Sequence, residues 1–586
     1  MLYERARRDG GKLDSHKAPT GAEYLALWLI TKGVRTVAGI PGSAVLPLYR
    51  ALAETPRIRH ILPRHEQGAG FIAQGMARST GQPAVCIATS GPGATNLLTP
   101  LADAYRDSVP LLALVGQVAT PGIGKDSFQE IDIQGMADPI SRAVYVARRA
   151  ADLPAILVRA WQQLTSGRPA PVVIELPKDV QEASVGHPEA LSLPPGQPVA
   201  AGGADSPAPS DEAIAEATAE LQSAQRPVLL IGGGVIAAGG GEAARQLAEQ
   251  IGMPVASTLM GLGALPDDHP QYLGLIGMHG DTAANRAVEQ ADLIVIAGAR
   301  LSDRTTGLIS EFCPHARVIH IDIDARELGK RLPADLPIHA DARSALQALA
   351  SASQSRAAAS QHATTPWLSV DRDPPPGTEH PKGLIRHLAT QSSKPTIVAT
   401  DVGQHQMWAA QGFPFERPRQ WLTSGGLGTM GFGLPTAMGA ALANPDHRVL
   451  CLTSDGSLLM NIQEFATLAE LELDVHIVLL DNRGLGLVRQ QQDLFYGGCR
   501  FASSHQQPTD FCALARAFGL AAHDLPQEAS QDPLGTILEK PGPSLLRIPV
   551  DSDQRVLPIV PPGAANRDAL GNEEVLEGGL SSESDS

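Results

Sequence analysis

Two polar residues 27 positions apart each follow a short apolar run in the second half of the chain. Val449–Thr453 precedes Asp455, and Val475–Leu480 precedes Asn482. Both runs predict buried strands, and one helix between them would complete a β–α–β unit. Ligands of open parallel sheets bind at the carboxyl ends of strands, where both polar residues are placed. A carboxylate and an amide oxygen at this edge suit Mg²⁺, which completes its octahedron with water and phosphate oxygens.

Gly456 and Ser457 follow Asp455 at the expected start of the helix. Backbone N–H groups at a helix start can bind phosphate, so the stretch is consistent with a diphosphate site. The alternative is that Asp455 and Gly456 form only a turn that caps the helix. This stretch alone leaves both interpretations open.

The rest of the chain repeats an alternation of apolar strands and amphipathic helices. The strand segments are rich in Val, Ile and Leu without polar alternation, as in "VCIAT", "PVVIEL", "PVLLIG" and "LIVIAG". Strands of this kind belong to parallel sheets covered on both faces. Segments rich in Pro, Gly and Ala at 187–212 and 351–381 are expected to be linkers. We therefore expect an α/β protein with three doubly wound parallel-sheet domains at 19–186, 207–350 and 382–560, followed by an acidic tail at 561–586.

Composition excludes several classes of partner. The formal net charge is −16 over 586 residues, which disfavours nucleic acid. No apolar run approaches the length of a membrane span, and the first residues lack the apolar region of a signal peptide. The five cysteines show no paired metal or redox spacing, and buried thiols in a reducing compartment are expected. We expect a cytoplasmic protein without nucleic-acid or membrane partners.

The stretch around Asp455 and Asn482 resembles the thiamin diphosphate motif, whose family form is GDG, a spacer and NN. The resemblance implies that Asp455, Asn482 and the backbone carbonyl of Gly484 hold Mg²⁺ against the diphosphate. The sequence departs from the family pattern at Ser454 and Asp481, where the family has Gly and Asn. Neither departure removes an implied metal ligand, although Asp481 adds a negative charge.

A second stretch, "ILPRHEQGAGFIAQGMARSTGQPAVCIATSGPGATNLL", places Glu66 at the start of a Gly- and Ala-rich helix. Taken alone, a glutamate in the first turn of a helix indicates a surface residue that the helix dipole favours. The stretch resembles the pyrimidine-binding domain of thiamin diphosphate enzymes. The resemblance implies that Glu66 hydrogen-bonds N1′ of the aminopyrimidine and activates the coenzyme, and that it does so across the interface of a homodimer or homotetramer.

Two further stretches, "TSGGLGTMGFGLPTAMGAAL" and "DVGQHQMWAAQ", match other parts of the family's coenzyme site. The resemblance assigns Met430 to a wedge beneath the coenzyme and the carbonyl of Gly428 to its 4′-amino group. A Gly-rich loop with a core methionine is the alternative. On the diphosphate side, the resemblance implies roles for Gly403, Gln404 and His405.

Over about 21–566 the chain resembles the catalytic subunits of FAD-containing acetohydroxyacid (acetolactate) synthases. The stretches that carry this narrower resemblance include "GIPGSAVLPLY", "GKDSFQEIDI", "GLIGMHGDTAANRAV", "GARLSDRTTG", "HIDIDARELGK", "LGLVRQQQDLFY" and "VPPGAAN". It implies a structural FAD in the central, Rossmann-like block, bound by Gly232, Gly234, Met278, His279, Gly280, Arg304 and Asp322. On residues alone, the glycines of "PVLLIGGGVIAAGGG" fit an ordinary turn as well as a nucleotide loop.

The same resemblance implies how substrate is recognised. Arg304 is implied to bind the carboxylate of the second 2-oxo acid, with a surface salt bridge as the alternative. Phe128 and Gln129 match residues that line the reacting unit, although Phe128 also reads as a core aromatic. Gln491 stands where the family has a tryptophan that favours 2-oxobutyrate, so we expect weak preference for this acceptor.

The function implied is decarboxylation of pyruvate and transfer of the remaining two-carbon unit to a second 2-oxo acid, as in branched-chain amino acid synthesis. A separate regulatory small subunit is a possible partner in this family. One alternative is another thiamin diphosphate-dependent 2-oxo acid decarboxylase or carboligase. The other is a catalytically inactive paralogue that retains the cofactors.

Overall fold

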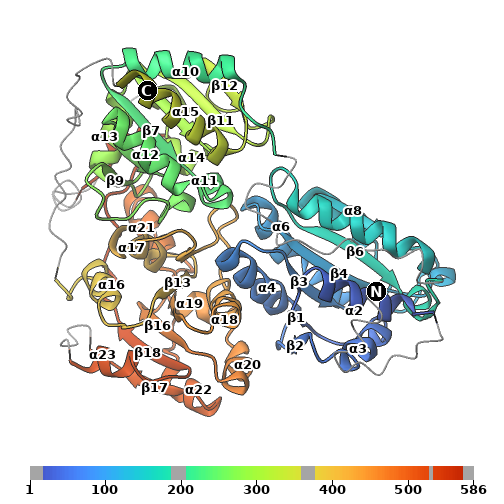
Figure 1. Cartoon of the computed structure of the whole chain (residues 1–586). Coiled ribbons are helices and arrows are strands. Elements are labelled where there is room, and N and C mark those ends of the chain that lie inside the picture. The colour runs from blue at the N-terminus through green and yellow to red at the C-terminus, as the bar shows by residue number, and fades with distance from the viewer. Residues whose placement is uncertain (1–17, 187–205, 358–376, 527–531, 572–586) are drawn as a thin grey trace, which may run out of the picture. The chain divides into compact units, whose positions relative to one another are not determined.

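The computed structural model describes residues 18–186, 206–357, 377–526 and 532–571 of the chain. Parts of both predicted linkers, at 187–205 and 358–376, and the tail from 572 onward lie outside these residues. The described part contains three six-stranded parallel sheets with flanking helices, which confirms the predicted α/β class (Figure 1).

The described residues form two compact units. The first contains the chain up to residue 186 together with 424–445 and 461–475, and the remaining described residues form the second. Two short pieces of the C-terminal third therefore belong with the N-terminal third.

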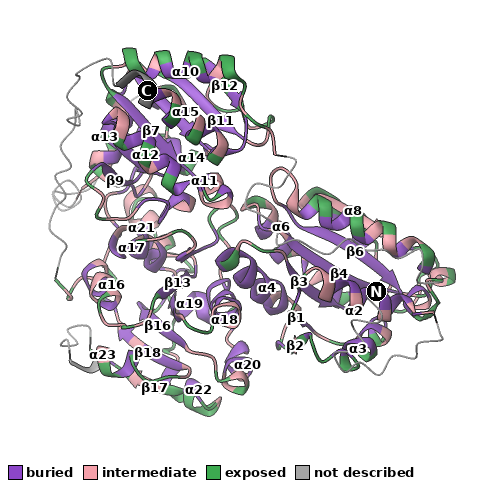
Figure 2. Cartoon of the chain, viewed as in Figure 1, coloured by how far each residue is buried: buried purple, intermediate pink, exposed green. Residues whose placement is uncertain are grey.

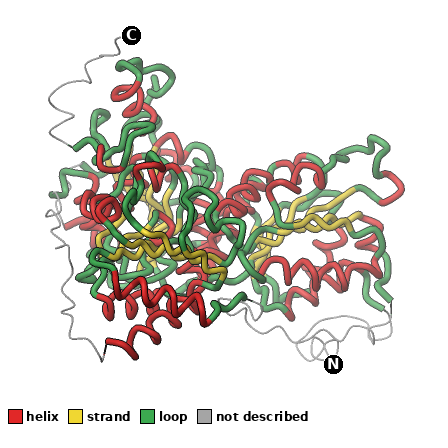
Figure 3. The backbone as a smooth tube through the Cα atoms, turned by 90° about the horizontal axis from the view of Figure 1, so that it is seen from above, coloured by secondary structure: helices red, strands yellow, loops and turns green. Residues whose placement is uncertain are grey.

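The sheet of the first unit has the order β2-β1-β3-β4-β6-β5. Its strands are β1 Thr36–Gly39, β2 Arg59–Ile61, β3 Ala84–Ala88, β4 Leu111–Gln117, β5 Ala143–Val146 and β6 Val172–Pro177. The central strands β3, β4 and β6 are buried throughout, as the unalternating apolar runs predict. Seen from above, helices lie on both sides of the strands (Figure 3).

The helices of the first unit include two contributed by distant sequence. They are α2 Gly21–Thr31, α3 Leu46–Ala53, α4 Glu66–Thr80, α5 Pro92–Thr95, α6 Leu98–Arg106, α7 Ile133–Ala137, α8 Leu153–Thr165, α9 Lys178–Glu182, α18 Gly433–Ala443 and α20 Glu464–Leu471. The backbones of helices α4 and α18 are in contact. A Cβ on Gly75 would overlap the carbonyl oxygen of Thr436, and a Cβ on Gly439 would overlap that of Ile72. Small residues on both helices permit this contact.

The second unit contains the other two sheets. The central sheet has the order β12-β11-β10-β7-β8-β9. Its strands are β7 Pro227–Ile231, β8 Val255–Ser257, β9 Tyr272–Leu275, β10 Leu293–Ala297, β11 Arg317–Asp322 and β12 Leu336–His339. The strand order reverses between β7 and β10, which makes their carboxyl ends a topological switch point.

The third sheet has the order β14-β13-β15-β16-β18-β17. Its strands are β13 Thr396–Thr400, β14 Trp421–Leu422, β15 Arg448–Ser454, β16 Val475–Asp481, β17 Ala521–Asp524 and β18 Ser544–Pro549. The strands predicted at Val449–Thr453 and Val475–Leu480 are thus confirmed. The expectation of one helix between them is wrong, because the segment forms two short helices, α19 Asp455–Leu458 and α20.

The remaining helices of the second unit surround these two sheets. They are α10 Asp211–Ser223, α11 Gly233–Ala238, α12 Gly241–Ile251, α13 Thr282–Gln290, α14 Asp303–Thr306, α15 Ala342–Ala357, α16 Pro381–Ala389, α17 Gln404–Gly412, α19, α21 Gly486–Phe495, α22 Phe511–Ala517 and α23 Asp532–Leu538. Strands such as β7 and β13 are buried, whereas outer faces of helices such as α10 are exposed (Figure 2). Within the described residues, no helix combines the length and apolar character needed to cross a membrane.

Candidate functional site

Three oxygen-bearing groups converge at the carboxyl edge of the third sheet. Asp455 opens α19 directly after β15, and Asn482 follows β16. The amide atom of Asn482 that faces this edge lies 2.8 Å from the carbonyl oxygen of Gly484 and 3.3 Å from Asp455 Oδ1. At the other end of the amide, Asn482 Nδ2 donates to Gln404 Oε1 at 2.9 Å. With this orientation three oxygens face one another without a proton between them, which is the arrangement that a hard divalent cation requires.

Asp455 is almost fully buried, with 2% of the residue exposed. Burial raises the pKa of its carboxyl, and the nearby charge of Asp481 raises it further. Its second oxygen, Oδ2, lies 2.9 Å from His505 Nδ1, and this contact lowers the pKa of the Asp455 carboxyl, against the effect of burial. A cation bound at Oδ1 would favour the ionised carboxyl in the same way.

Gln404, expected on the diphosphate side, has both ends of its amide occupied by protein groups. Its Oε1 accepts from Asn482, and its Nε2 donates to Gln490 Oε1 at 3.1 Å and to the carbonyl of Gln554 at 2.8 Å. Gln490 also exchanges two hydrogen bonds with the backbone of Val556, each 2.9 Å long. Gln404 therefore orients Asn482, and the amide chain anchors this arrangement to the segment after β18.

His405 and Gly403 lie at the carboxyl end of the neighbouring strand β13. His405 is buried, and neither ring nitrogen has a hydrogen bond of normal geometry among the described residues. Burial lowers its pKa to about 3, opposed by the carbonyl of Asp401, so the ring is neutral at physiological pH. Gly403 has φ +153°, and a Cβ there would lie 2.8 Å from His405 Cε1, so glycine is required. The Ser457 hydroxyl donates to the carbonyl of Val402 at 3.0 Å.

Glu66 begins α4 in the first unit, as the sequence predicts. Its Oε2 accepts a hydrogen bond from Asn96 Nδ2 at 2.8 Å, and a Cβ on Gly93 would lie 3.3 Å from its Oε1. The carboxyl is half-buried. Glu66, Gly93 and Asn96 thus meet at the carboxyl edge formed by β2 and β3, with one oxygen of Glu66 held by an amide.

Phe128 and Gln129 lie on the loop after β4 at the same edge. Phe128 is 87% exposed, so the core-aromatic alternative is wrong. Gln129 has φ +61°, and its backbone lies against Gly91, where an added Cβ would stand 2.9 Å from the Gln129 carbonyl oxygen. The loop therefore contacts the turn after β3 and presents an aromatic ring to the outside of the unit.

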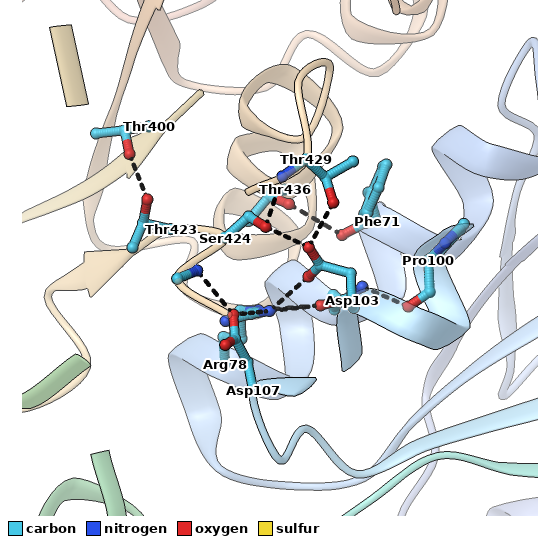
Figure 4. A network of polar contacts seen from close by, with 12 residues as sticks. Phe71, Arg78, Pro100, Asp103, Asp107, Thr400, Thr423, Ser424, Thr429 and Thr436 are labelled. Carbon is cyan, nitrogen blue, oxygen red and sulfur yellow. Dashed lines mark hydrogen bonds and ion pairs between the residues drawn. The ribbon is translucent and has the colours of Figure 1, made fainter. Parts of the chain in front are cut away.

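The segment that carries Gly428 and Met430 is held by a buried acidic group. Ser424 and Thr429 both donate to Asp103 Oδ2, the Thr429 contact being 2.8 Å long, and Arg78 binds Asp103 Oδ1 at 2.8 Å (Figure 4). Arg78 lies at the end of α4, the helix that begins at Glu66.

Gly428 and Met430 lie on either side of Thr429 in this segment. Gly428 is exposed, with φ +73° and no atom of the described residues within 4 Å of an added Cβ, and Met430 is half-buried. Met430 is therefore not a core methionine. The open space around Gly428 leaves room for a ligand.

The glycines of the central sheet lie at its topological switch point. A Cβ on Gly232 would overlap the carbonyl oxygen of Gly298, and a Cβ on Gly234 would stand 2.7 Å from Gly298 Cα. The Gly234 amide donates to the Gly298 carbonyl at 2.9 Å. Close packing of the two turns after β7 and β10 accounts for both glycines, which supports the ordinary-turn interpretation.

The other residues implied for FAD lie at or after the ends of three strands of the central sheet. Met278, His279 and Gly280 follow β9, Arg304 follows β10, and Asp322 ends β11. His279 is buried, and its Nδ1 lies 3.0 Å from the carbonyl of Pro558, which makes Nδ1 the protonated nitrogen. The Arg304 carbonyl accepts from the Met278 amide at 2.8 Å, while its side chain is 62% exposed with Nε 3.8 Å from Asp303 Oδ2, as the surface salt-bridge alternative expects. Asp322 ends β11, is nearly buried, and accepts from the Asp324 amide at 2.8 Å.

Gly280 and Gln491 complete the predicted set. A Cβ on Gly280 would stand 2.6 Å from the Gly277 amide nitrogen, so glycine closes this tight turn. Gln491 is half-buried on α21, next to the buried Gln490. Within the described residues no group of three or more His, Cys, Asp and Glu side chains could hold a metal, so the one candidate uses a single carboxylate with amide and carbonyl oxygens.

Sequence reasoning missed Asn96, His505 and Gln490, which contact Glu66, Asp455 and Gln404. Asn96 could have been found from the sequence, because it lies in the Gly-rich turn that follows the next strand along the chain from Glu66. The other two lie in segments whose return to the site depends on tertiary structure.

Comparisons with known proteins agree with this arrangement. Residues 19–136 match the thiamine pyrophosphate enzyme N-terminal TPP binding domain, 214–349 the central domain and 401–548 the C-terminal TPP binding domain. The acetolactate synthase isozyme 1 large subunit of Escherichia coli K12 is 48% identical over 96% of this chain and 99% of its own. The isozyme 2 large subunit of the same organism is 42% identical over 94% and 99%. The acetolactate synthase large subunit of Lactococcus lactis is 39% identical over 96% and 99%.

These relatives match nearly the whole chain, including both TPP binding domains and the central domain between them. The chain therefore belongs to the acetolactate synthase large-subunit family of thiamine pyrophosphate enzymes.

Proposed function

We propose that this chain is an acetolactate synthase, which decarboxylates pyruvate and joins the remaining two-carbon unit to a second 2-oxo acid. The observation that carries the proposal is the convergence of the Asp455, Asn482 and Gly484 oxygens, in a chain whose length matches acetolactate synthase large subunits. Thiamin diphosphate is the coenzyme indicated by the two TPP binding domains.

Mg²⁺ is proposed as the metal held by Asp455, Asn482 and Gly484. One carboxylate with two neutral oxygens suits a metal that shares its coordination sphere with a diphosphate. The neutral, buried ring of His405 and the backbone at Gly403 would bind on the diphosphate side, together with Gly456 and Ser457. Gln404 acts there by orienting Asn482.

Glu66 is proposed to hydrogen-bond N1′ of the aminopyrimidine, with Gly428 and Met430 placed against the same ring system. Asn96 would hold Glu66 Oε2 and leave Oε1 for the coenzyme. When bound, thiamin diphosphate supplies the electron sink that allows pyruvate to lose CO₂. The protein contributes by orienting this carboxyl and by restricting its rotation.

FAD is proposed as a structural group of the central sheet, near Met278, His279, Gly280, Arg304 and Asp322. These residues lie close to a topological switch point, which supports a ligand there. Gly232 and Gly234 would contribute through the shape of the turn, since their lack of side chains is used in packing against Gly298.

Four residues are proposed to act on substrate. The exposed guanidinium of Arg304 would bind the carboxylate of the second 2-oxo acid, because its planar fork matches a carboxylate. Phe128 and Gln129 would line the reacting unit from their loop, and Gln491 would face the acceptor's alkyl group.

We further propose that the three predicted blocks at 19–186, 207–350 and 382–560 act as pyrimidine-binding, FAD-binding and diphosphate-binding domains of a homodimer or homotetramer. A regulatory small subunit is a proposed partner, consistent with the "large subunit" names of the relatives. Five free cysteines, four of them buried, support a reducing compartment such as the cytoplasm.

The test is product analysis of the purified chain with Mg²⁺, thiamin diphosphate and FAD, first with pyruvate alone and then with added 2-oxobutyrate. Acetolactate from pyruvate is the expected product, and Glu66→Gln should reduce its formation by about 100-fold or more. Acetaldehyde and CO₂ would identify a decarboxylase, and lack of turnover despite coenzyme binding would identify an inactive paralogue.

A further inference from the structure

Helix α20 holds the segment that leads directly into Glu66. Both oxygens of Glu464, the first residue of α20, accept from the Arg64 amide, at 2.9 and 3.2 Å. Its Oε1 also accepts from the His65 amide at 3.1 Å. The two residues that precede Glu66 are therefore both bound through their backbones to one side chain 400 positions away.

The Glu464 carboxylate is fully buried and its position is narrowly defined. Its exposed fraction is 0%, and Thr467 Oγ1 donates to its Oε2 at 2.9 Å. A Cβ on Gly68, in the first turn of α4, would stand 2.5 Å from Glu464 Oε1. Leaving a buried carboxyl without these donors would be costly, so the segment and the side chain hold each other in place.

The contact matters because it holds the backbone that leads into Glu66. Its side chain accepts from Asn96, and its backbone follows His65, the N-cap residue of α4. A catalytic carboxyl needs placement within about 0.5 Å, and an error of about 1 Å can reduce a rate about 100-fold. Fixing the amides of Arg64 and His65 fixes the point from which the Glu66 side chain extends.

We propose that Glu464 is a positioning residue for Glu66, acting through the Arg64 and His65 amides; this inference rests on the proposed function of Glu66. Glu464 does not contact the reacting groups. Its role is to set the start of α4 so that the Glu66 carboxyl meets the aminopyrimidine at hydrogen-bond distance.

The decisive variant is Glu464→Gln. Glutamine keeps one acceptor oxygen but places an NH₂ group among N–H and O–H donors, so at least one contact with the segment is lost. The matched control is Glu470→Gln on the same helix, because Glu470 is exposed and contacts only the Arg64 side chain among the hydrogen bonds of this segment, at 2.5 Å. Gly68→Ala is a second route to the same displacement, because the added Cβ pushes against Glu464 Oε1 while the glutamate itself is kept.

Two measurements separate positioning from folding. Amide hydrogen exchange of residues 62–69 in the cofactor-free chain should accelerate about tenfold in Glu464→Gln and stay unchanged in Glu470→Gln. The rate at which bound thiamin diphosphate exchanges its C2 proton for deuterium should fall at least tenfold in Glu464→Gln and Gly68→Ala, with the coenzyme dissociation constant within threefold of wild type.

Each outcome bears on the inference. Wild-type C2 exchange in Glu464→Gln, together with faster amide exchange, would overturn it. If Glu464→Gln does not fold, the same comparison is made with Gly68→Ala. If the wild-type chain binds the coenzyme but does not accelerate C2 exchange, the proposed function of Glu66 fails, and the inference fails with it.

Discussion

Arg547 donates from Nε to Asp481 Oδ2 at 2.7 Å, across the paired strands β18 and β16. Asp481 is the residue that replaces the family's first asparagine, and its side chain is 6% exposed. Arg547 also binds Asp524 of β17 at 2.8 Å. The negative charge beside Asn482, the proposed metal ligand, is therefore paired with a cation within the sheet, although it still raises the pKa of Asp455.

Removing Arg547 should destabilise the chain more than neutralising Asp481. Arg547→Met leaves a buried carboxylate without its cation, and we expect a loss of about 1–3 kcal/mol in the free energy of unfolding. Asp481→Asn keeps one acceptor oxygen and turns an NH₂ group toward the other donor, but it leaves no buried charge without a partner, so its loss should be smaller than that of Arg547→Met. Urea unfolding checks this, and the double variant should be more stable than Arg547→Met. Equal stability of those two would contradict the charge argument.

His279 should make stability depend on pH between about 6.5 and 4. Burial lowers the pKa of His279 to about 4, opposed by the Pro558 carbonyl, whereas an unfolded histidine has a pKa of about 6.5. In this window the unfolded chain binds a proton that the folded chain does not, so stability falls as pH falls.

The comparison for this prediction is His279→Gln, whose amide can donate to Pro558 without titrating. The free energy of unfolding of the wild type should fall with decreasing pH more steeply than that of the variant, by up to about 1.4 kcal/mol per pH unit. Thermal unfolding midpoints at pH 7, 6 and 5 measure the difference. Parallel curves for the two proteins would show that His279 does not contribute.

Gly486 should be required for metal binding. A Cβ at this position would overlap both Gln404 Oε1 and Asn482 Nδ2, the two atoms of the hydrogen bond that orients Asn482. Gly486→Ala should therefore raise the Mg²⁺ concentration for half-saturation about tenfold or more, despite the better helix propensity of alanine.

Gln404→Leu should act in the same direction as Gly486→Ala, because it removes the Asn482 partner. Tryptophan fluorescence during Mg²⁺ titration with thiamin diphosphate present provides the readout. Unchanged Mg²⁺ affinity in both variants would refute the orienting role of Gln404.

The fold was accessible from sequence because parallel strands carry a strong local signal. The runs at Val449–Thr453 and Val475–Leu480 are apolar on both faces and end in polar residues, so both their type and their ends could be predicted. The helix between them was less accessible. Asn461 Nδ2 donates to the Gly431 carbonyl at 2.6 Å, and this tertiary contact lies where the chain leaves α19 and before α20 begins.

The candidate site was accessible only in part, for a related reason. Asp455, Asn482 and Glu66 lie at strand or helix ends, and sequence position fixes such ends well. The residues that hold the neighbouring chain do not obey local spacing, because the contact of Glu464 with Arg64 spans 400 residues and that of Arg547 with Asp481 spans 66. Resemblance implied roles for the first group, and only the folded chain revealed the second.

Gln491 should set the acceptor preference of the enzyme, and Gln491→Trp should strengthen it. A buried CH₂ contributes about 0.8 kcal/mol, so an indole that covers the extra methylene of 2-oxobutyrate should favour this acceptor about fourfold over the wild-type chain. Gln491 is half-buried on α21 and makes no side-chain hydrogen bond among those found in the described residues, so the substitution removes no polar side-chain contact found there. Gln491→Ala is the control, because it shortens the side chain without adding a ring. Competition between pyruvate and 2-oxobutyrate, with both products quantified, measures the ratio. A ratio in Gln491→Trp equal to that of the wild type and of Gln491→Ala would place the acceptor's alkyl group elsewhere.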